Sequence, residues 1–575
     1  MAEQRNCKQC SQQFEVTDDD LVFLDKISPE FNGQKYPISA PTFCPTCREI
    51  RRMLLRNERV IYKRKSDQSG VELTSIFAPD KTDYKVFAPK EWYSDSWNPM
   101  DYARDFDFSK SFFEQFDSLI HDVPRPANNL ISVEMCDYCN QVRNSKNCYL
   151  CYNANECENC MYCSETHRAK NCVDCLDTQS CEFCFSCFDC AACNACQYLD
   201  HCKNCSQCYF TYDCSGCKNV MLCNGLHNQQ YMFKNEQLTK EQYEAKLKEY
   251  DFGKRSVIES LKNEFVELKR NAIHNATNNI NSENCTGDYL IDCSNCENCF
   301  NALKIENCKN VLNVEDKALE SRELSFVASP ELCYEGAMVV GYKNLFGMMV
   351  IDGNGNMYCQ FCENCKDCFG CVGLRQKRYC IFNKQYTKEE FEALVPKIIE
   401  HMKTSGEWGE FFPASLSPYG YNETVAHIYH PKSKEEATAF GAKWQDNDYS
   451  LKFDGPFYEP KDDIKDYANN EPESDGLLKG ILKCSVTGKA FKIMPQELAF
   501  YMEHNIPVPT KYAEARYMEL FKLRNPRVLY ERQCMCDQTD HGHDAVCQNK
   551  FKTTYAPDRP EKIYCEDCYL KTTIS

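Results

Sequence analysis

Residues 183–208 read FCFSCFDCAACNACQYLDHCKNCSQC, and nearly every third residue among them is a cysteine. A period of three fits neither an α-helix, whose period is about 3.6 residues, nor a strand with one buried face, whose period is about 2. The pattern extends in both directions, because every cysteine from Cys136 to Cys223 falls on one phase of a three-residue repeat. Where that phase lacks cysteine it carries small or apolar residues, namely Val142, Ser145, Ala154, Thr166, Ala169, Thr178, Leu199, Thr211 and Val220.

A longer period of twelve residues is superimposed on the triplets. It recurs in one series of cysteines and in the asparagines that precede three of them: Cys136, Cys148, Cys160, Cys172, Cys184, Cys196 and Cys208, with Asn147, Asn159 and Asn171. We predict a narrow β-solenoid with twelve residues per coil, in which every third side chain points inward. The asparagines are expected at corners, where Asn tolerates positive φ. Coils stacked about 4.8 Å apart satisfy one another's backbone groups.

The competing interpretation of such CxxCxxC runs is a metal cluster, as in a metallothionein or a ferredoxin. A ferredoxin run needs a wider third gap and a proline after its last cysteine, and both are missing from the run Cys187, Cys190, Cys193 and Cys196. A thiol store has no need for Val, Leu, Ala and Thr on the same phase. Because free cysteine packs as a small hydrophobic side chain, we favour packing over metal binding here.

A second cysteine-rich block follows from residue 285. Its inward phase changes between Val314 and Leu324 and again before Cys359, and each change predicts a bulge or a loop. The intermediate phase is expected to turn five consecutive triplet positions inward, Val339, Tyr342, Leu345, Met348 and Ile351. Both blocks exit through a capping box that begins a helix, and each helix is expected to cover the last coil: Thr239 with Gln242, and Thr387 with Glu390.

The amino-terminal region has the ligand spacing of a four-cysteine zinc ribbon, in Cys7-x2-Cys10 and Cys44-Pro-Thr-Cys47. The region from Cys484 repeats the same framework near the other end of the chain. Three of its four ligand positions are occupied by residues that do not fit this site, Thr487, Tyr512 and Ala515. We therefore expect that this copy holds no metal.

A second ribbon-like unit follows each of these. At the carboxyl end it supplies three ligands, Cys547, Cys565 and Cys568. The fourth is ambiguous among Cys534, Cys536, His541 and His543; Cys536 is preferred because thiolates already make up the site, and His543 comes second. The amino-terminal counterpart has Ser66 and Ser69 and is expected to be metal-free. We thus predict two structural Zn²⁺ ions, each with four protein ligands and no open position for a catalytic water.

The motifs FCPTCRE, LRNERVIYKRK, FFEQF, NCYLCY, YGYNET and YAPDRPEKIYCEDCY together resemble a family of uncharacterised cysteine-rich zinc-ribbon proteins of candidate-phyla bacteria with small genomes. The likeness spans nearly the whole chain. It implies domain boundaries and zinc ligands and implies no reaction. This chain departs from the family pattern at Thr487, Tyr512 and Ala515, and in the stretched segment CMCDQTDHGHDAVC, which is why the fourth ligand is ambiguous.

The composition limits the classes of function. A net charge of −18 argues against a surface that is basic throughout, and the 43 cysteines indicate a reducing compartment. With no signal segment or spanning run, we expect a cytoplasmic protein without membrane contact. The helix after Cys47 is basic, and nucleic-acid contact is one interpretation of Arg48, Arg51, Arg52, Arg56 and Arg59. The alternative is that these arginines pair within the protein, with the acidic and aromatic segment 91–130 as their nearest partner.

No motif of an enzyme is present, so we expect a non-catalytic zinc-binding scaffold that presents a rigid solenoid surface to an unknown protein partner. The alternatives are a nucleic-acid or ribosome-associated zinc-ribbon factor, in which RNA is the partner, and a metal or thiol-redox buffer. No small-molecule substrate is indicated. The expected fold is mainly β, divided into a tandem zinc-ribbon module (1–90), an acidic connector (91–130), the first solenoid (131–238), a helical linker (239–284), the second solenoid (285–386), a capping helix (387–405), a proline-rich and aromatic connector (406–478) and a second tandem module (479–575).

Overall fold

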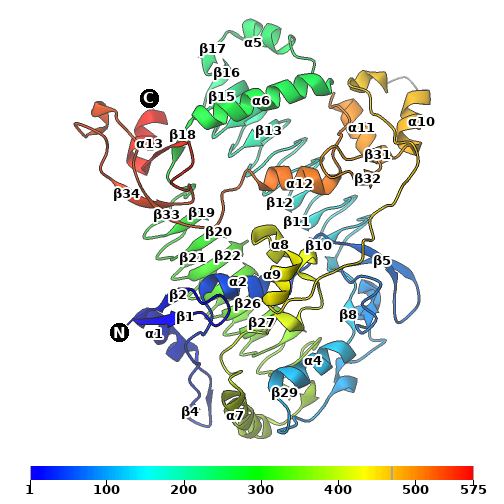
Figure 1. The fold of residues 1–575 in the computed structure, drawn as a ribbon, viewed down its shortest axis with the longest axis vertical. Coiled ribbons are helices and arrows are strands. Elements are labelled where there is room, and N and C mark those ends of the chain that lie inside the picture. Colours follow the sequence, from blue (N-terminus) through cyan, green and yellow to red (C-terminus); the bar gives the residue numbers. More distant parts are fainter. Residues whose placement is uncertain (1, 468–470, 574–575) are drawn as a thin grey trace.

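The computed structural model describes residues 2–467 and 471–573, so residues 468–470 of the predicted 406–478 connector lie outside the described residues. The fold is mixed, because the described part of the chain contains thirteen α-helices beside its strands. A large, curled, mostly parallel sheet lies next to a second set of parallel strands, with helices and hairpins packed around both (Figure 1). The expectation of a mainly β chain was therefore too narrow, since helices connect and cover the sheets.

The first set of strands, called here the first stack (residues 130–233), repeats at the spacing that the sequence indicates. Its strands pair parallel with an offset of twelve residues, as in Asn140 with Tyr152 and Tyr152 with Ser164. Single bridges such as Ser164 with Leu176 continue the offset where no strand is assigned. The strands are β9 Leu130–Ile131, β10 Asn140–Arg143, β11 Tyr152–Asn155, β12 Ser164–His167, β13 Gln197–Asp200, β14 Ser206–Tyr212, β15 Lys218–Asn224 and β16 Gln230–Phe233.

The backbone turns once in every triplet. The residue before each inward position has a positive φ, close to +50°, for almost the whole length of the stack. Asn147, Asn159 and Asn171 are among these residues, with φ of 53°, 54° and 52°, as the sequence predicts. Asn accepts this left-handed conformation more easily than most residues. Many other residue types occupy equivalent positions, among them Ala192 with φ of 51°.

Thiols fill the space inside the first stack. The cysteines of the inward phase are almost fully buried in one cluster, and Cys160, Cys172 and Cys184 are each 0% exposed. Most inward sulfurs lie beside two carbonyls, one two residues before the cysteine and one nine residues after it; for Cys160 these are the carbonyls of Glu158 and Ala169, both at 3.4 Å. Burial raises the pKa of the Cys223 thiol to about 12. A neutral thiol can donate to these carbonyls, so cysteine packs here as a small side chain with a weak donor.

The second stack (residues 280–381) contains the large curled sheet. Its offsets are twelve residues in most pairs, thirteen between Lys309 and Arg322, and eleven between Tyr334 and Leu345. The pairs are parallel throughout. The strands are β19 Gly287–Ile291, β20 Cys299–Leu303, β21 Ile305–Glu306, β22 Lys309–Val314, β23 Ala318–Leu319, β24 Arg322–Val327, β25 Pro330–Glu331, β26 Tyr334–Tyr342, β27 Leu345–Asn354 and β28 Gln360–Glu363.

One part of the predicted inward phase was wrong. Val339 is buried inside the stack, but the register then shifts between Val339 and Gly341, one coil earlier than expected. After the shift the inward positions include Asn344 and Asn356, each 1% exposed, whose side-chain amides donate to the carbonyls of Gly353 and Cys365 at 2.9 Å. Four residues expected inside therefore lie elsewhere: Tyr342, Leu345, Met348 and Ile351. A one-residue shift turns each side chain to another face, and the buried amides satisfy their own polar groups inside the stack.

Each stack ends in a short antiparallel hairpin followed by a helix. The hairpins are β16 with β17 Glu236–Gln237 and β29 Cys380–Ile381 with β30 Lys384–Gln385. The helices are α5 Lys240–Leu247 and α7 Lys388–Ser405, and both begin with the predicted capping boxes. Helix α6 Arg255–Asn271 then leads to β18 Ile273–Asn275 and the start of the second stack.

The stacks lie side by side and run in opposite directions, so that α5 and α7 stand at opposite ends of the molecule (Figure 1). Gln141, near the start of the first stack, lies beside Met338 of the second. His201, much further along the first stack, contacts Tyr289, near the start of the second. These two contacts lie on a seam along which the two stacks meet.

The terminal modules share a hairpin, a helix, a second helix and a second hairpin in the same order; the front module adds a short hairpin between its helices, and the back module adds a strand and a helix at its end. The front module contains β1 Glu3–Asn6, β2 Gln13–Val16, α1 Asp18–Ile27, β3 Glu30–Phe31, β4 Gln34–Lys35, α2 Pro45–Met53, β5 Tyr62–Lys65 and β6 Glu72–Ser75. The back module contains β31 Leu482–Lys483, β32 Ala490–Phe491, α11 Pro495–Glu503, α12 Ala513–Phe521, β33 Tyr530–Gln533, η5 Thr539–His541, β34 Lys550–Thr553, β35 Lys562–Tyr564 and α13 Glu566–Thr573.

One helix of each module packs on the stack that is farther from the module in sequence. Helix α2 of the front module lies against β24 and β26 of the second stack. Helix α12 of the back module lies across the first stack near β12 (Figure 1), where Arg516 pairs with Asp174. The connecting segments between stacks and modules contain β7 Val86–Phe87, α3 Pro89–Trp92, η1 Pro99–Tyr102, α4 Phe112–Asp122, β8 Arg125–Pro126, η2 Ala414–Leu416, η3 Tyr421–Glu423, α8 Val425–Tyr429, α9 Lys434–Ala439, η4 Ile464–Asp466 and α10 Glu471–Lys479.

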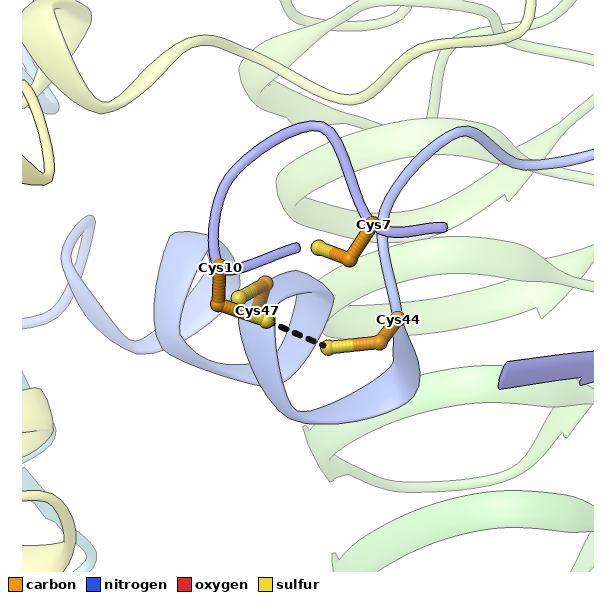
Figure 2. Close-up of side chains that lie close together, drawn as sticks. All are labelled: Cys7, Cys10, Cys44 and Cys47. Atoms are coloured by element: carbon orange, nitrogen blue, oxygen red, sulfur yellow. Dashed lines mark hydrogen bonds between the residues drawn. The ribbon is translucent and has the colours of Figure 1, made fainter. Parts of the chain in front are cut away.

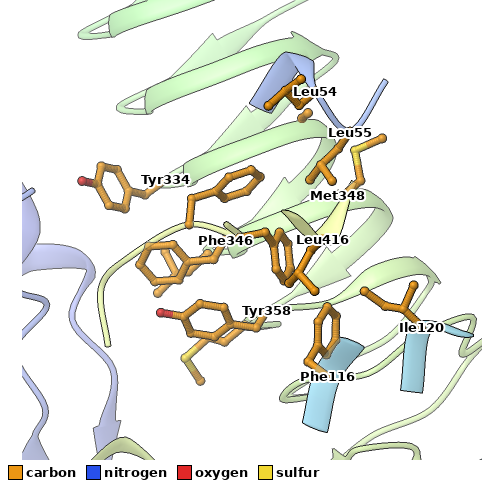
Figure 3. Close-up of a cluster of buried hydrophobic side chains, with 14 of the residues drawn as sticks. Leu54, Leu55, Phe116, Ile120, Tyr334, Phe346, Met348, Tyr358 and Leu416 are labelled. Carbon is orange, nitrogen blue, oxygen red and sulfur yellow. The ribbon is translucent and has the colours of Figure 1, made fainter. Parts of the chain in front are cut away.

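The largest hydrophobic core lies outside the second stack, between its outer face and the surrounding helices. Figure 3 shows side chains of the sheet meeting those of the connecting helices, with Phe346 and Tyr358 stacked at a ring separation of 4.6 Å. Phe116 and Ile120 of α4 join them, together with Leu416 from the connector. The connecting segments thus contribute to a hydrophobic core. In the described residues no helix has the length and apolar character to cross a membrane.

Candidate metal centres and the groove between the stacks

The front module brings the four predicted ligands together. Cys7 and Cys10 lie in the turn between β1 and β2, whereas Cys44 precedes α2 and Cys47 lies in its first turn. Figure 2 shows the four thiols converging, and the dashed line marks the contact of 3.7 Å between the sulfurs of Cys10 and Cys44. All four sulfurs lie within 4.8 Å of one another. This arrangement can hold one metal ion.

Local backbone structure sets this geometry. The amide of Cys7 donates to the carbonyl of Gln12 at 2.8 Å, and the amide of Ser11 donates to the carbonyl of Cys7 at 2.9 Å. Ser11 has a φ of 60°, so the turn closes tightly behind both thiols. Contact with the Cys47 thiol, against the effect of burial, lowers the pKa of Cys44 to about 5. The N-terminus of α2 also favours negative charge at Cys44.

The back module brings together Cys534, Cys547, Cys565 and Cys568, whose sulfurs lie within 4.8 Å of one another. The fourth member is thus Cys534, which we had named only as an alternative, and not the preferred Cys536. The amide of Met535 donates to the carbonyl of Ile563 at 3.0 Å, and the amide of Cys565 donates to the Cys534 sulfur at 3.2 Å. This pairing places Cys534 beside the CxxC turn.

Cys536 belongs to a second group, with His541, His543 and Cys568, and the ligand atoms of these four residues also lie within 4.8 Å of one another. The Cys536 sulfur is 3.2 Å from Nδ1 of His541, and the Cys568 sulfur is 3.5 Å from Nε2 of His543. Cys568 is common to both groups. The sequence had placed all four residues near one site, but its spacing did not indicate two overlapping sets.

The two positions predicted to be metal-free keep the shape of the site without its ligands. The amide of Cys484 donates to the carbonyl of Lys489 at 2.8 Å, and the amide of Gly488 donates to the carbonyl of Cys484 at 2.9 Å, as in the front turn. The amide of Gly70 donates to the carbonyl of Ser66 at 2.9 Å in the same way. Within the described residues, the groups that could hold a metal are the three named above, and none includes a cysteine of either stack.

The arginines of the front module face the interior of the protein. Arg52 is 1% exposed, and its guanidinium contacts Glu323 at 3.0 Å and Glu335 at 2.9 Å, both on the second stack. The other members are also buried and paired: Arg48 with Glu323 and Glu335, Arg51 with Glu410, Arg56 with Glu58, and Arg59 with Glu514. The interpretation of Arg48, Arg51, Arg52, Arg56 and Arg59 as nucleic-acid contacts is therefore corrected, since their charges are already neutralised inside the fold.

A polar groove runs along part of the seam between the stacks, called here the seam groove. It is lined from the first stack by residues such as Asp177, Ala191 and Lys203, and from the second stack by residues such as Lys304 and Glu315. Its lining contains both acidic and basic side chains. The sequence does not indicate the groove, because its two walls come from segments at least 75 residues apart.

One titratable cluster stands at the end of this groove. Nδ1 of His201 lies 2.5 Å from Asp189, and Nε2 lies 3.1 Å from the hydroxyl of Tyr289. Burial alone lowers the pKa of His201, but the carboxylates of Asp200 and Asp189 outweigh burial and raise it to about 9. Asp200, 0% exposed, also pairs with Lys269. The imidazolium therefore neutralises buried carboxylates at neutral pH.

Comparison with known proteins gives no family for this chain. No family model matches it, and no curated protein matches it. Among solved structures, a protein assigned as an acetyltransferase from Desulfovibrio desulfuricans G20 shares 10% identity with a TM-score of 0.08. The match covers 38% of this chain, and the chain spans 52% of that protein. A likeness this low carries no argument about fold or activity.

Proposed function

We propose that the chain is a non-catalytic, zinc-binding scaffold, that its two stacks are narrow β-solenoids, and that the seam groove receives a protein partner. The observation that carries this proposal is that the thiols of the two stacks pack as small buried side chains inside them. They are buried, they lie beside carbonyls of their own and the next coil, and none belongs to a described metal-binding group. Side chains packed in this way stiffen a rod and leave few thiols accessible as nucleophiles, since Cys136 and Cys285 are the partly exposed members among the stack cysteines.

Zinc fits the two all-thiol groups best. Four thiolates in tetrahedral range are typical of structural zinc, with no position left for a reacting water. The front group closes the turn between β1 and β2 onto α2, and α2 in turn carries the arginines that pair with the second stack. Zinc in a ribbon of this kind would fix the module that holds the stacks in place.

The partner that the groove suits is a protein segment of mixed charge. The groove offers carboxylates, amines and amides from both stacks, whereas the arginine-rich helix that would favour a nucleic acid is buried. Hydrogen bonding and charge pairing along such a surface give specificity.

A photo-crosslinking amino acid placed at Ala191 tests this proposal in the full chain. Ala191 lines the groove, and Asn194, one triplet further on, is exposed on another face and serves as the matched control. We expect a defined crosslinked protein from native cell extract at position 191 and none at position 194. Equal crosslinking at both positions, or none at either, would count against a groove-specific partner.

The nucleic-acid alternative remains distinguishable by salt dependence. A protein that neutralises phosphates loses affinity steeply as salt rises. Filter binding of the full chain to RNA across a salt series is expected to show no such slope, since the arginines of α2 are already paired. A steep slope would favour the alternative.

The metal or thiol-redox buffer is separated by elemental analysis. A scaffold holds metal only in its terminal modules, whereas a buffer would load many of its 43 cysteines. Titration of the purified chain with excess Zn²⁺ is expected to saturate at the terminal groups alone.

A further inference from the structure

We propose that the back module binds two metal ions that share the thiolate of Cys568. This inference rests on the proposed function in one respect, namely that the thiol groups of the modules bind metal. It goes further in assigning a second ion to Cys536, His541, His543 and Cys568, beside the ion held by Cys534, Cys547, Cys565 and Cys568.

The distances within the second group match a metal site. With Zn–N of about 2.0 Å and Zn–S of about 2.3 Å, a tetrahedron separates nitrogen from sulfur by about 3.5 Å. The Cys568 sulfur lies 3.5 Å from Nε2 of His543, and the Cys536 sulfur lies 3.2 Å from Nδ1 of His541. The Cys536 thiol also contacts that of Cys568, which closes the group.

Cys568 stands between the two groups. Its thiol contacts Cys565 and Cys547 of the first group and Cys536 of the second. Seven residues make up the two groups, and one of them counts twice, which gives eight coordination positions. Two four-coordinate ions need that number, so one bridging thiolate satisfies both.

The loop between β33 and β34 is shaped to deliver the second set. It contains the short helix η5, which ends at His541, and Gly542 has a φ of 89°, so the chain reverses and brings His543 back. The amide of Cys547 donates to the carbonyl of Cys536 at 2.8 Å, which fixes the base of the loop. Cys536 is 0% exposed and the His541 side chain is 8% exposed, so these ligands point inward.

The mixture of thiolates and imidazoles selects the class of ion. Cys and His together favour zinc or a similar borderline ion over Mg²⁺ or Ca²⁺. The first ion has four thiolate ligands, including the shared one, whereas the second ion has two thiolates and two imidazoles. The two ions therefore differ in ligand type and can be told apart spectroscopically.

Native mass spectrometry of the full zinc-loaded chain provides the first test. We expect three ions per chain, one in the front module and two in the back. The double variant H541N/H543N is expected to hold two, because it removes two ligands of one ion and none of the other. The matched control C7S/C10S is expected to hold two as well, through loss of the front ion.

Substitution with ¹¹³Cd supplies a readout of the bridge itself. Two cadmium nuclei joined by one thiolate are expected to show mutual scalar coupling, in C7S/C10S as in the native chain, and to lose it in H541N/H543N. Two ions per native chain would overturn the shared site and leave the zinc scaffold standing. Three ions in H541N/H543N, or no cadmium coupling, would also overturn it, and a chain without metal would refute both proposals.

Discussion

Among single residues, the arginines after Cys47 show most clearly how this chain uses charge. The sequence predicts their helix and leaves two interpretations open, contact with a nucleic acid or pairing within the protein, with the nearby acidic segment 91–130 as the expected partner. Arg52 instead pairs with Glu323 and Glu335, which lie 271 and 283 residues away. Local sequence cannot specify such partners, because only the packing of α2 on β24 and β26 brings them together.

Removing one member of this buried network should destabilise the chain strongly. We expect Arg52→Met to lower the free energy of unfolding by roughly 3–5 kcal/mol, because two carboxylates lose a buried partner. Denaturant unfolding measures this cost. The double variant Arg52→Met/Glu335→Gln should lose less than the sum of the two single variants, and strict additivity would contradict the proposed pairing.

His201 should make stability depend on pH. Because its pKa is raised from 6.5 to about 9, protonation stabilises the folded chain. The contribution is complete below about pH 6.5 and disappears as pH rises through about 9, and its size is on the order of 3 kcal/mol. Denaturant midpoints of the native chain and of His201→Gln across this pH range measure it. The difference between them should shrink as pH rises, and a constant difference would contradict the assignment.

The fourth thiol of the back module is a residue that ligand spacing in the sequence does not identify. Cys534 and Cys536 are separated by one residue, and the preference for Cys536 rested on thiolate chemistry that both residues share. The pairing of Met535 with Ile563 decides between them, and this contact joins segments 28 residues apart. The ligands in CxxC turns could be predicted because these turns are local structures.

Among the elements, the twelve-residue offset and the buried phase of the first stack could be predicted from the sequence. Its inward phase is dictated by volume, since facing walls admit only small side chains, and the sequence shows that phase directly. The second stack was harder, because inward asparagines and glycines replace cysteines near Asn344 and Gly353. A Cβ on Gly353 would meet the Asn356 side chain at 2.5 Å, so glycine is needed there, but a glycine by itself does not reveal which face it occupies.

The left-handed residue in every triplet leads to a prediction about glycine. Glycine usually destabilises a strand relative to alanine, and here it should stabilise the stack. Ala192 is exposed with a φ of 51°, a conformation that an L-residue adopts at a cost of about 1–2 kcal/mol. We expect Ala192→Gly to stabilise the first stack by roughly 0.5–1 kcal/mol, after allowance for the entropy of glycine. The neighbouring Ala191→Gly should destabilise it by a similar amount. Thermal unfolding followed by circular dichroism compares the two, and equal signs would contradict the geometry.

For the whole molecule, metal removal should affect the terminal modules and spare the stacks. The stacks are held by backbone pairing and buried thiols, whereas the front turn is closed by Cys7, Cys10, Cys44 and Cys47. We expect limited proteolysis after treatment with a strong chelator to cut within residues 2–60 and 530–573 and to leave 130–381 intact. Mass spectrometry of the fragments locates the cuts. Early cleavage inside the stacks would show that metal supports the entire fold.

The crossed packing of the terminal modules has a consequence for how the chain is made. Helix α2 is synthesised early, yet its acidic partners Glu323 and Glu335 leave the ribosome about 270–280 residues later. At a synthesis rate of about 5–20 residues per second, the arginines of α2 remain unpaired with these glutamates for roughly tens of seconds. During this interval the arginines of α2 are not yet paired with the second stack, so an acidic chaperone or the ribosomal RNA can compete for them.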